Sequence, residues 1–279
     1  MAIRFQQHPG LVVYLTAGDT GLHPRLAAHS SHPGADLSTT LSSTLAIALA
    51  AIDAGADVIE LGVPFSDPLA DGPVIQRASE RALLRGTRLI DVLALTRELR
   101  IARPQAGLVI FSYLNPVLRF GLTRFADAAA EAGVDGVLLT DMIVEEAGEY
   151  LAEMHRVNLA PIFLAAPTSP EDRLRAIGEN SQGFVYAISR TGITGKQQQV
   201  AADAAALVER IRRWTQLPVA LGFGISNADH VAEVGRFADA AVIGSAIVEL
   251  IEKSSEDEAP AAVARFIQGL RQSNLAQTR

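Results

Sequence analysis

Short apolar runs recur along the chain, and each is followed by a stretch in which apolar residues have helical spacing. The runs are rich in Val, Ile and Leu without alternation, which is typical of strands covered on both faces. The segment after the first run shows the helical pattern, with apolar residues at Leu41, Leu45, Ala48, Leu49 and Ile52. The predicted strands are eight: Leu11–Thr16, Asp57–Val63, Gly107–Tyr113, Gly136–Thr140, Ala160–Ala165, Gly183–Ser189, Pro218–Gly224 and Ala238–Gly244.

Eight strand and helix units in succession, with no linker between two halves, favour a closed barrel over an open doubly wound sheet. The predicted fold is therefore α/β, a single (β/α)8 TIM barrel that forms one domain over residues 1–279. Gly55, Gly86 and Gly133 each predict the end of a helix before the next strand. A last helix is predicted to begin at Pro260 and to run to about Leu270.

One connection is much longer than the others. The residues at about 21–43 are rich in Ser, Thr, His, Pro and Gly. Long connections of this composition are typical of surface loops. We therefore expect a surface insert at this position.

Composition narrows the class of protein. Hydrophobic residues make up 49% of the chain, and the net charge of −7 comes from dispersed acids, which disfavours nucleic-acid binding. The absence of cysteine excludes disulfides, thiolate catalysis and cysteine metal sites. The N-terminus lacks the apolar core of a signal peptide, and no stretch is long enough to span a membrane. These features predict a cytoplasmic protein that binds no membrane.

Candidate chemistry lies at the carboxyl ends of the strands, where the loops of such barrels converge. Glu60 lies near the end of the apolar run "ADVIELGV". Desolvation there would raise its pKa and let it carry a proton near neutral pH. The other reading of Glu60 is a carboxylate held by an arginine or by backbone donors.

Two further carboxylates follow in the segment "ELGVPFSDPLADGP". Asp71 belongs to a loop rich in Pro and Gly, and such a loop can bring it to a ligand without burying it permanently. The alternative role for Asp71 is capping of the helix that Gly72 and Pro73 precede. Asp67 is expected to organise the turn.

Glycine-rich loops follow the last two predicted strands. In "GFGIS" (Gly222–Ser226) and "GSAI" (Gly244–Ile247), small residues stand between a strand and a helix. Backbone N–H groups and a helix N-terminus can hold an anion there, and barrel enzymes often bind phosphate at these loops. A third loop, Ser189–Lys196, could reach over the same ligand. The alternative is that these glycines only form tight turns.

The residue types limit the reaction. An imine-forming aldolase needs a lysine inside the barrel, but neither Lys196 nor Lys253 falls on a predicted strand. A metal aldolase needs clustered ligands, yet the histidines avoid the strand ends, and His23, His29 and His32 lie in the solvated insert. Proton transfer by carboxylates is the chemistry that remains.

The segment "DAGADVIELGVPFSDPLADGPVIQRASERAL" closely resembles the signature of the tryptophan synthase alpha subunit family. The resemblance continues in order through "YLTAGD", "FSYLNPV", "GVDGVLLTD", "FVYAISRTGITG", "LGFGIS" and "AVIGSAIV". It covers nearly the whole chain. Such a long ordered set is far more specific than a single motif.

The resemblance implies a reaction and roles for particular residues. The family cleaves indole-3-glycerol phosphate to indole and glyceraldehyde 3-phosphate by a retro-aldol reaction, without metal or organic cofactor. Glu60 matches the catalytic glutamate that moves protons between indole C3 and the glycerol hydroxyl. Asp71 matches the loop aspartate that stabilises charge on the indole nitrogen, and Tyr186 matches a tyrosine of the same site.

The resemblance also implies three groups of binding residues. Some positions match residues that flank the indole, although each could equally be ordinary core packing. Others match the phosphate grip and the loop that closes over it. The indole group is Tyr14, Phe111, Tyr113, Leu138 and Phe223; the phosphate group is Gly195, Gly224, Gly244 and Ser245; the loop group is Arg190 and Thr194.

The chain departs from the family pattern near the partner surface. The family usually has proline where Val13, Thr20 and Ile143 stand, begins with a longer N-terminal helix and lacks the insert. In the family, the loops around Asp67 and Ile143 face a beta subunit, which joins indole to serine with pyridoxal phosphate. A stand-alone lyase that releases free indole is the second hypothesis. A non-catalytic barrel that binds a phosphorylated ligand or activates a partner is the third, although a pure binder has no need of both Glu60 and Asp71.

Overall fold

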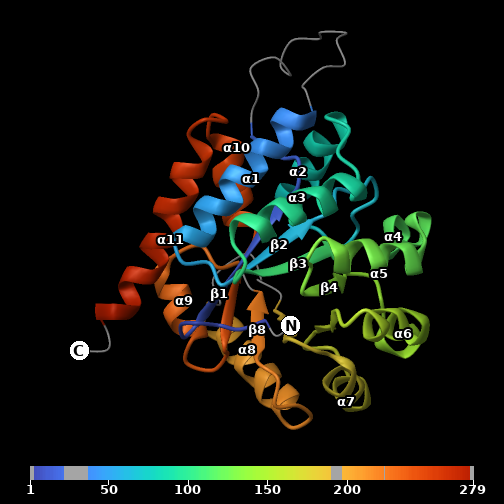
Figure 1. Cartoon of the computed structure of the whole chain (residues 1–279). Coiled ribbons are helices and arrows are strands. Elements are labelled where there is room, and N and C mark those ends of the chain that lie inside the picture. Colours follow the sequence, from blue (N-terminus) through green and yellow to red (C-terminus); the bar gives the residue numbers. More distant parts are fainter. Residues whose placement is uncertain (1–2, 22–36, 190–196, 223, 277–279) are drawn as a thin grey trace.

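A parallel sheet curves round on itself, with helices on its outer side (Figure 1). The computed structural model describes residues 3–21, 37–189, 197–222 and 224–276. Within these residues the sheet has nine strands in the order β5-β4-β3-β2-β1-β9-β8-β7-β6. They are β1 Gly10–Thr16, β2 Val58–Gly62, β3 Gly107–Ser112, β4 Gly136–Leu139, β5 Ala160–Ile162, β6 Leu164–Ala165, β7 Val185–Ile188, β8 Val219–Gly222 and β9 Ala240–Ile243.

The two ends of this sheet order are one continuous stretch of chain, and this closes the barrel. β5 pairs with β4, β6 pairs with β7, and only Phe163 separates β5 from β6. Two further backbone bonds lie across the junction, from the N–H of Gln182 to the oxygen of Pro161 (2.8 Å) and from the N–H of Tyr186 to that of Phe163 (3.1 Å). The predicted strand Ala160–Ala165 is thus two short strands, and the predicted TIM barrel is confirmed.

Helices connect the strands and cover the outside of the barrel. Two helices, rather than one, follow both β2 and β3. The last helix was predicted to begin at Pro260; it begins one residue earlier and extends beyond Leu270. The helices are α1 Leu37–Asp53, α2 Pro73–Leu84, α3 Leu89–Ala102, α4 Leu114–Phe120, α5 Leu122–Glu131, the 3-10 turn η1 Val144–Glu146, α6 Gly148–Arg156, α7 Glu171–Asn180, α8 Gln197–Arg212, α9 Ala228–Val234, α10 Ser245–Lys253 and α11 Ala259–Ala276.

The three glycines predicted to stop helices all have positive φ, at 111° for Gly55, 84° for Gly86 and 79° for Gly133. A side chain is disfavoured in this backbone conformation, which is why glycine ends these helices. Gly55 and Gly133 lead into strands, as expected. The expectation was wrong for Gly86, because a second helix, α3, follows it instead of a strand.

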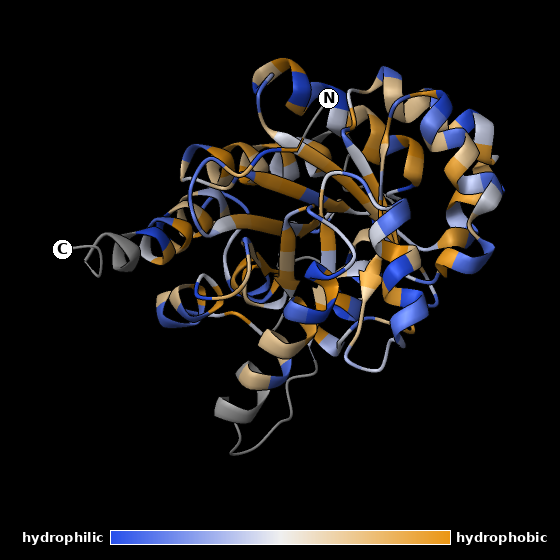
Figure 2. Cartoon of the chain, turned by 90° about the horizontal axis from the view of Figure 1, so that it is seen from below, coloured by the Kyte–Doolittle hydropathy of each residue, from blue (hydrophilic) through white to orange (hydrophobic). Residues whose placement is uncertain are grey.

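Side chains of each strand alternate between two cores. One set packs outward against the helices, as Ile59 and Leu61 do on β2. The other set fills the barrel interior, as Val58 does, and is joined there by Ile3 and Phe5 from the N-terminal segment. Figure 2 shows the strands coloured mostly as hydrophobic, while the surrounding helices alternate hydrophobic and hydrophilic segments. Because side chains alternate with a period of two, Glu60 shares the inward face of β2 with Val58.

An aspartate fixes the register at the start of β2, β4 and β9. Before β4, the Asp135 carboxylate accepts the backbone N–H of Leu108 on β3 at 2.9 Å and pairs with Arg100 at 2.7 Å. Asp57 and Asp239 repeat this arrangement before β2 and β9. Each carboxylate thus joins a strand to its neighbour and to an arginine, which favours one pairing register.

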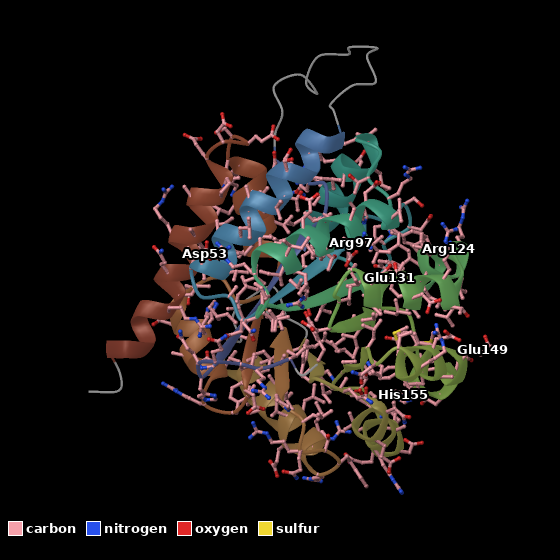
Figure 3. The ribbon with its side chains drawn as sticks, in the orientation of Figure 1. Asp53, Arg97, Arg124, Glu131, Glu149 and His155 are labelled. Atoms are coloured by element: carbon pink, nitrogen blue, oxygen red, sulfur yellow. The ribbon has the colours of Figure 1, made fainter. Side chains whose placement is uncertain are left out.

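The outward faces of α3, α5 and α6 carry charged side chains, several of which are labelled in Figure 3. Arg97 of α3 lies 3.9 Å from Glu131 of α5, and both are exposed. The Arg124 guanidinium lies over the Phe120 ring, 4.6 Å from its centroid. Exposed pairs of this kind add little stability. Over the residues that the structure describes, no helix is long and apolar enough to cross a membrane.

The structure describes part of the predicted insert, and it describes the N-terminal segment from residue 3, where the family begins with a longer helix. Residues 37–43 belong to α1, whereas residues 22–36 lie outside the described residues. Residues 3–9 contain no helix, so in the described part of the chain β1 is the first element.

Candidate functional site

Glu60 lies in the barrel interior with 0% of its surface exposed. Among the described residues, neither of its side-chain oxygens has a hydrogen-bond partner. Within the described residues, Glu60 is therefore not a carboxylate held by an arginine or by backbone donors. Burial raises the pKa of Glu60 from its ordinary value of 4.5 to about 8, so the group is mainly protonated at neutral pH.

Two tyrosines occupy the interior beside Glu60. Tyr14 is paired in register with Glu60 across β1 and β2, and Tyr186 comes from β7. Burial raises the pKa of Tyr14 well above its usual range, and the carboxylates of Asp71 and Glu60 raise it further. Burial followed by the Glu60 charge does the same to the pKa of Tyr186. Both side chains therefore remain neutral hydroxyls.

The two tyrosine rings fit only because glycine stands opposite each of them. A Cβ atom on Gly222 would lie 2.7 Å from the Tyr186 hydroxyl, and one on Gly62 would overlap the Tyr14 hydroxyl. Both distances are shorter than van der Waals contact allows. Gly62 thus has a role that its sequence position alone does not reveal.

We predict that Gly62→Ala lowers both the activity of this site and thermal stability, because the buried Tyr14 ring must move from Glu60 to admit a methyl group. Gly72→Ala is the matched control, since a Cβ at Gly72 meets nothing within 4 Å and its φ is −74°. Steady-state kinetics and a melting curve on both variants test this. Equal behaviour of the two variants would contradict the described packing.

Aromatic and aliphatic side chains continue the wall around Glu60. Phe111 meets Tyr14 edge to face, with centroids 5.1 Å apart, and Leu138 is fully buried in the interior cluster. Tyr113 lies nearer the rim, where its ring is 5.0 Å from that of Phe65. These side chains form an aromatic and aliphatic wall of the kind that can surround a flat apolar ring.

Asp71 lies in the loop between β2 and α2 and is half-buried. Burial raises its pKa from 3.8 to about 6, while the Tyr113 hydroxyl opposes the rise. The same hydroxyl accepts the backbone N–H of Ala70 at 2.9 Å, which ties this loop to the end of β3. Gly72 is the N-cap of α2 and has no side-chain cap bond, so Asp71 does not cap the helix. Asp67 is exposed and accepts a bond from Ser66 at 2.5 Å, as expected of a turn residue.

The two glycine loops differ in their readiness to hold an anion. At the start of α9, the Asn227 side chain accepts the N–H of His230 at 2.9 Å and so occupies a donor that an anion would need. At the start of α10, Gly244 is the N-cap without a side-chain cap, and Ser245 is exposed. The N-terminus of α10, which has no side-chain cap, therefore offers the better anion site. Gly224 is exposed and has a φ of 42°.

Four predicted site residues lie outside the described residues, namely Phe223, Arg190, Thr194 and Gly195. Lys196 also lies outside them, whereas Lys253 is on α10 and pairs with Glu249 at 2.6 Å. Among the residues that the structure does describe, no group of three or more His, Asp or Glu side chains could hold a metal ion.

Sequence reasoning missed one part of the site, which is the contribution of α2. Val74, Ile75 and Ala78 pack in one cluster with Tyr14 and with Val248 of α10. The apolar spacing at the start of α2 could have indicated a buried face, but not its partners. The Thr16 hydroxyl, which donates to the Tyr14 hydroxyl at 3.3 Å, also belongs to this part of the interior.

Comparison with known proteins gives a consistent result. The family model described as tryptophan synthase alpha chain matches residues 2–277. The tryptophan synthase alpha chain of Solibacter usitatus is 47% identical over 257 residues, which cover 92% of this chain and 89% of that protein. The alpha chain of Geobacter sulfurreducens is 44% identical over 271 residues, covering 97% and 95%.

Solved structures agree in fold. The crystal structure of tryptophan synthase subunit alpha from Legionella pneumophila has a TM-score of 0.80 at 32% identity, covering 95% of this chain and 92% of that one. A chain from the tryptophan synthase a2b2 complex of Pyrococcus furiosus also has a TM-score of 0.80, at 34% identity, with coverage of 94% and 98%. With its barrel, its buried carboxyl on β2 and these matches over nearly its whole length, the chain belongs to the tryptophan synthase alpha chain family.

Proposed function

We propose that this chain cleaves indole-3-glycerol phosphate to indole and glyceraldehyde 3-phosphate, as the alpha subunit of tryptophan synthase, with Glu60 as its proton carrier. The observation that carries the proposal is the Glu60 carboxyl, which is fully buried and unpartnered among the described residues. A group in this state costs folding free energy, and a role in proton transfer explains its presence.

The reaction needs a proton to be given and a proton to be taken. Protonation of indole C3 creates a cation, in which the bond from C3 to the carbinol carbon can break. The electron pair of the broken bond returns to the indole ring. At the same time the carbinol hydroxyl loses its proton and becomes the carbonyl of glyceraldehyde 3-phosphate. Glu60 enters protonated, gives its proton to C3 and, as a carboxylate, takes the hydroxyl proton. It ends as it began, so one carboxyl serves as acid and then as base.

Asp71 has a separate task because its pKa is lower. With a pKa of about 6 it is mainly ionised at neutral pH, when Glu60 is mainly protonated. Its carboxylate can accept a bond from the indole N–H and stabilise the cation. Environments that separate the pKa values of two carboxyls are a common means of dividing acid and base roles.

The remaining assignments concern substrate binding. Tyr186 lines the reacting centre, and the indole is flanked by Tyr14, Phe111, Tyr113, Leu138 and Phe223. The phosphate is held by Gly195, Gly224, Gly244 and Ser245, and Arg190 and Thr194 belong to the closing loop. The uncapped N-terminus of α10 supports the phosphate assignment.

We predict that Gly224→Asp weakens substrate binding, because its charge repels the phosphate. Gly224→Asn is the control for strain, since asparagine has nearly the same shape and tolerates the positive φ of this position. Calorimetric titration with glycerol 3-phosphate measures the effect. If both variants bind equally well, the phosphate must lie elsewhere.

The proposed partner is a tryptophan synthase beta subunit. Leu69, which is 94% exposed, and Ile143 lie in the two loops that face the beta subunit in the family. Exposed apolar side chains of this size are suited to a protein partner. We further propose that the chain forms one cytoplasmic barrel domain and needs no metal or organic cofactor for this cleavage.

The test of this function is indole release by the purified chain, with and without a beta subunit. Cleavage that a beta subunit strongly stimulates supports the alpha-subunit function. Full activity of the chain alone would favour the stand-alone lyase, and binding of substrate without cleavage in either sample would favour a non-catalytic barrel.

A further inference from the structure

Helix α2 lies between two parts of the proposed site, the loop that carries Asp71 and the start of α10. It starts directly after the loop that carries Asp71, with Gly72 as N-cap and Pro73 in its first turn. Its Ile75 side chain reaches within 3.9 Å of the position that a Cβ of Gly244 would occupy, at the start of α10. The first turn of α2 and the start of α10 therefore lie side by side.

A chain of ion pairs joins the same two helices. Glu252 of α10 accepts two bonds from Arg77 of α2, at 2.9 and 2.7 Å, and one from Arg81 at 2.8 Å. Arg81 turns its other two nitrogens to Asp19, after β1, at 2.8 Å each. We call these four residues, Asp19, Arg77, Arg81 and Glu252, the α2–α10 clamp.

The clamp is more than a surface ion pair. The side chains of Asp19, Arg81 and Glu252 are 1%, 12% and 16% exposed. Bidentate pairs between arginine and carboxylate fix both the distance and the orientation of the two groups. Partial burial makes it costly to break such a pair. The clamp therefore holds α2, α10 and the end of β1 in one relative position.

We propose that the α2–α10 clamp couples phosphate binding at the start of α10 to the placement of Asp71 at the start of α2. Glu252 and Arg81 are then positioning residues, which act through the two helices and do not touch the substrate. This inference rests on the proposed function, because it assigns the phosphate to α10 and the indole nitrogen to Asp71. It explains why two helices that carry different parts of the site share a rigid charged connection.

Glu252→Gln tests the coupling when combined with removal of the substrate phosphate. Indole release is measured with indole-3-glycerol phosphate and with indole-3-glycerol, for the wild type and the variant. Because typical coupling between sites is about 5- to 150-fold, we expect the preference of kcat for the phosphorylated substrate to fall roughly tenfold in Glu252→Gln. Turnover of indole-3-glycerol should change little, since this substrate has no phosphate whose binding at α10 could affect Asp71.

Two further variants serve as a control and as a substitute for Glu252→Gln. Lys253→Gln is the matched control, because it breaks an ion pair that stays within α10, and it should keep the wild-type preference. Arg77→Gln serves if Glu252→Gln does not fold, since Arg77 is the most exposed member of the clamp and should show a smaller loss in the same direction. Thermal melting shows whether each variant is folded.

Equal losses for the two substrates in Glu252→Gln and Arg77→Gln would overturn the coupling and leave the clamp with a structural role. A raised KM at unchanged kcat for the phosphorylated substrate would also overturn it, because Asp71 would then be unaffected. Absence of cleavage by the wild-type enzyme would refute the proposed function, and the coupling with it.

Discussion

Glu60→Gln will lower indole release by roughly a thousandfold, in the range that loss of a general acid or base produces. Glutamine keeps the shape of the side chain but can neither give nor take the proton that the reaction needs. Binding of glycerol 3-phosphate should stay close to wild type, because the proposed phosphate site is at the glycine loops and the start of α10 and does not include Glu60. Single-turnover kinetics separates the chemical step from binding. Turnover near the wild-type rate would refute the assigned role.

The same variant should change the pH dependence of stability. The pKa of Glu60 is about 8 in the folded protein and 4.5 in an ordinary environment. A raised pKa contributes stability that is fully present below pH 4.5 and is lost as the pH rises through 8. Relative to the wild type, Glu60→Gln should therefore gain free energy of unfolding between pH 5 and pH 8.5, on the order of a few kcal/mol. Urea unfolding at both pH values measures this. Parallel curves would contradict a buried protonated carboxyl.

Asp71→Asn is expected to lower kcat roughly a hundredfold or more, because it removes the negative charge that stabilises the indole cation. It should also alter the pH profile of kcat/KM. In the wild type the rate should fall as the pH drops through about 6, where Asp71 becomes protonated, and as it rises through about 8, where Glu60 loses its proton. The variant should keep the fall near pH 8 and lose the fall near pH 6.

Asp67→Asn is the matched control. Asp67 lies in the same loop, but its side chain is exposed and accepts a hydrogen bond from its neighbour Ser66. It should keep most of the wild-type turnover when the purified chain is assayed alone. A similar loss in both variants would mean that the loop tolerates no change of charge. The special role of Asp71 would then be wrong.

The fold was largely predictable because each barrel strand must be apolar on both faces. Unbroken apolar runs such as Gly136–Leu139 therefore stand out from the helical spacing around them. Two features escaped prediction for physical reasons. The interruption at Phe163 depends on how the sheet closes, and the second helix after Gly86 depends on what α2 covers, and neither is a property of the local sequence.

The site was predictable where position on a strand decides chemistry. Glu60 could be singled out because an acid at the end of a buried strand is costly unless it has a use. The α2–α10 clamp could not be found in this way, since Asp19 and Arg81 are 62 residues apart, and Arg81 and Glu252 are 171 apart. The need for Gly62 beneath Tyr14 likewise becomes visible only when β1 and β2 are paired.

The protonation state of Glu60 in the free protein tests the central claim most directly. Carbon-13 NMR on protein labelled at the glutamate side-chain carboxyls can follow this group, and Glu60→Gln identifies its signal. We predict that this signal titrates with a midpoint at about pH 8, as burial without a partner requires. A midpoint near the ordinary value of 4.5 would contradict the account, because Glu60 would then be a carboxylate at neutral pH with no proton to give.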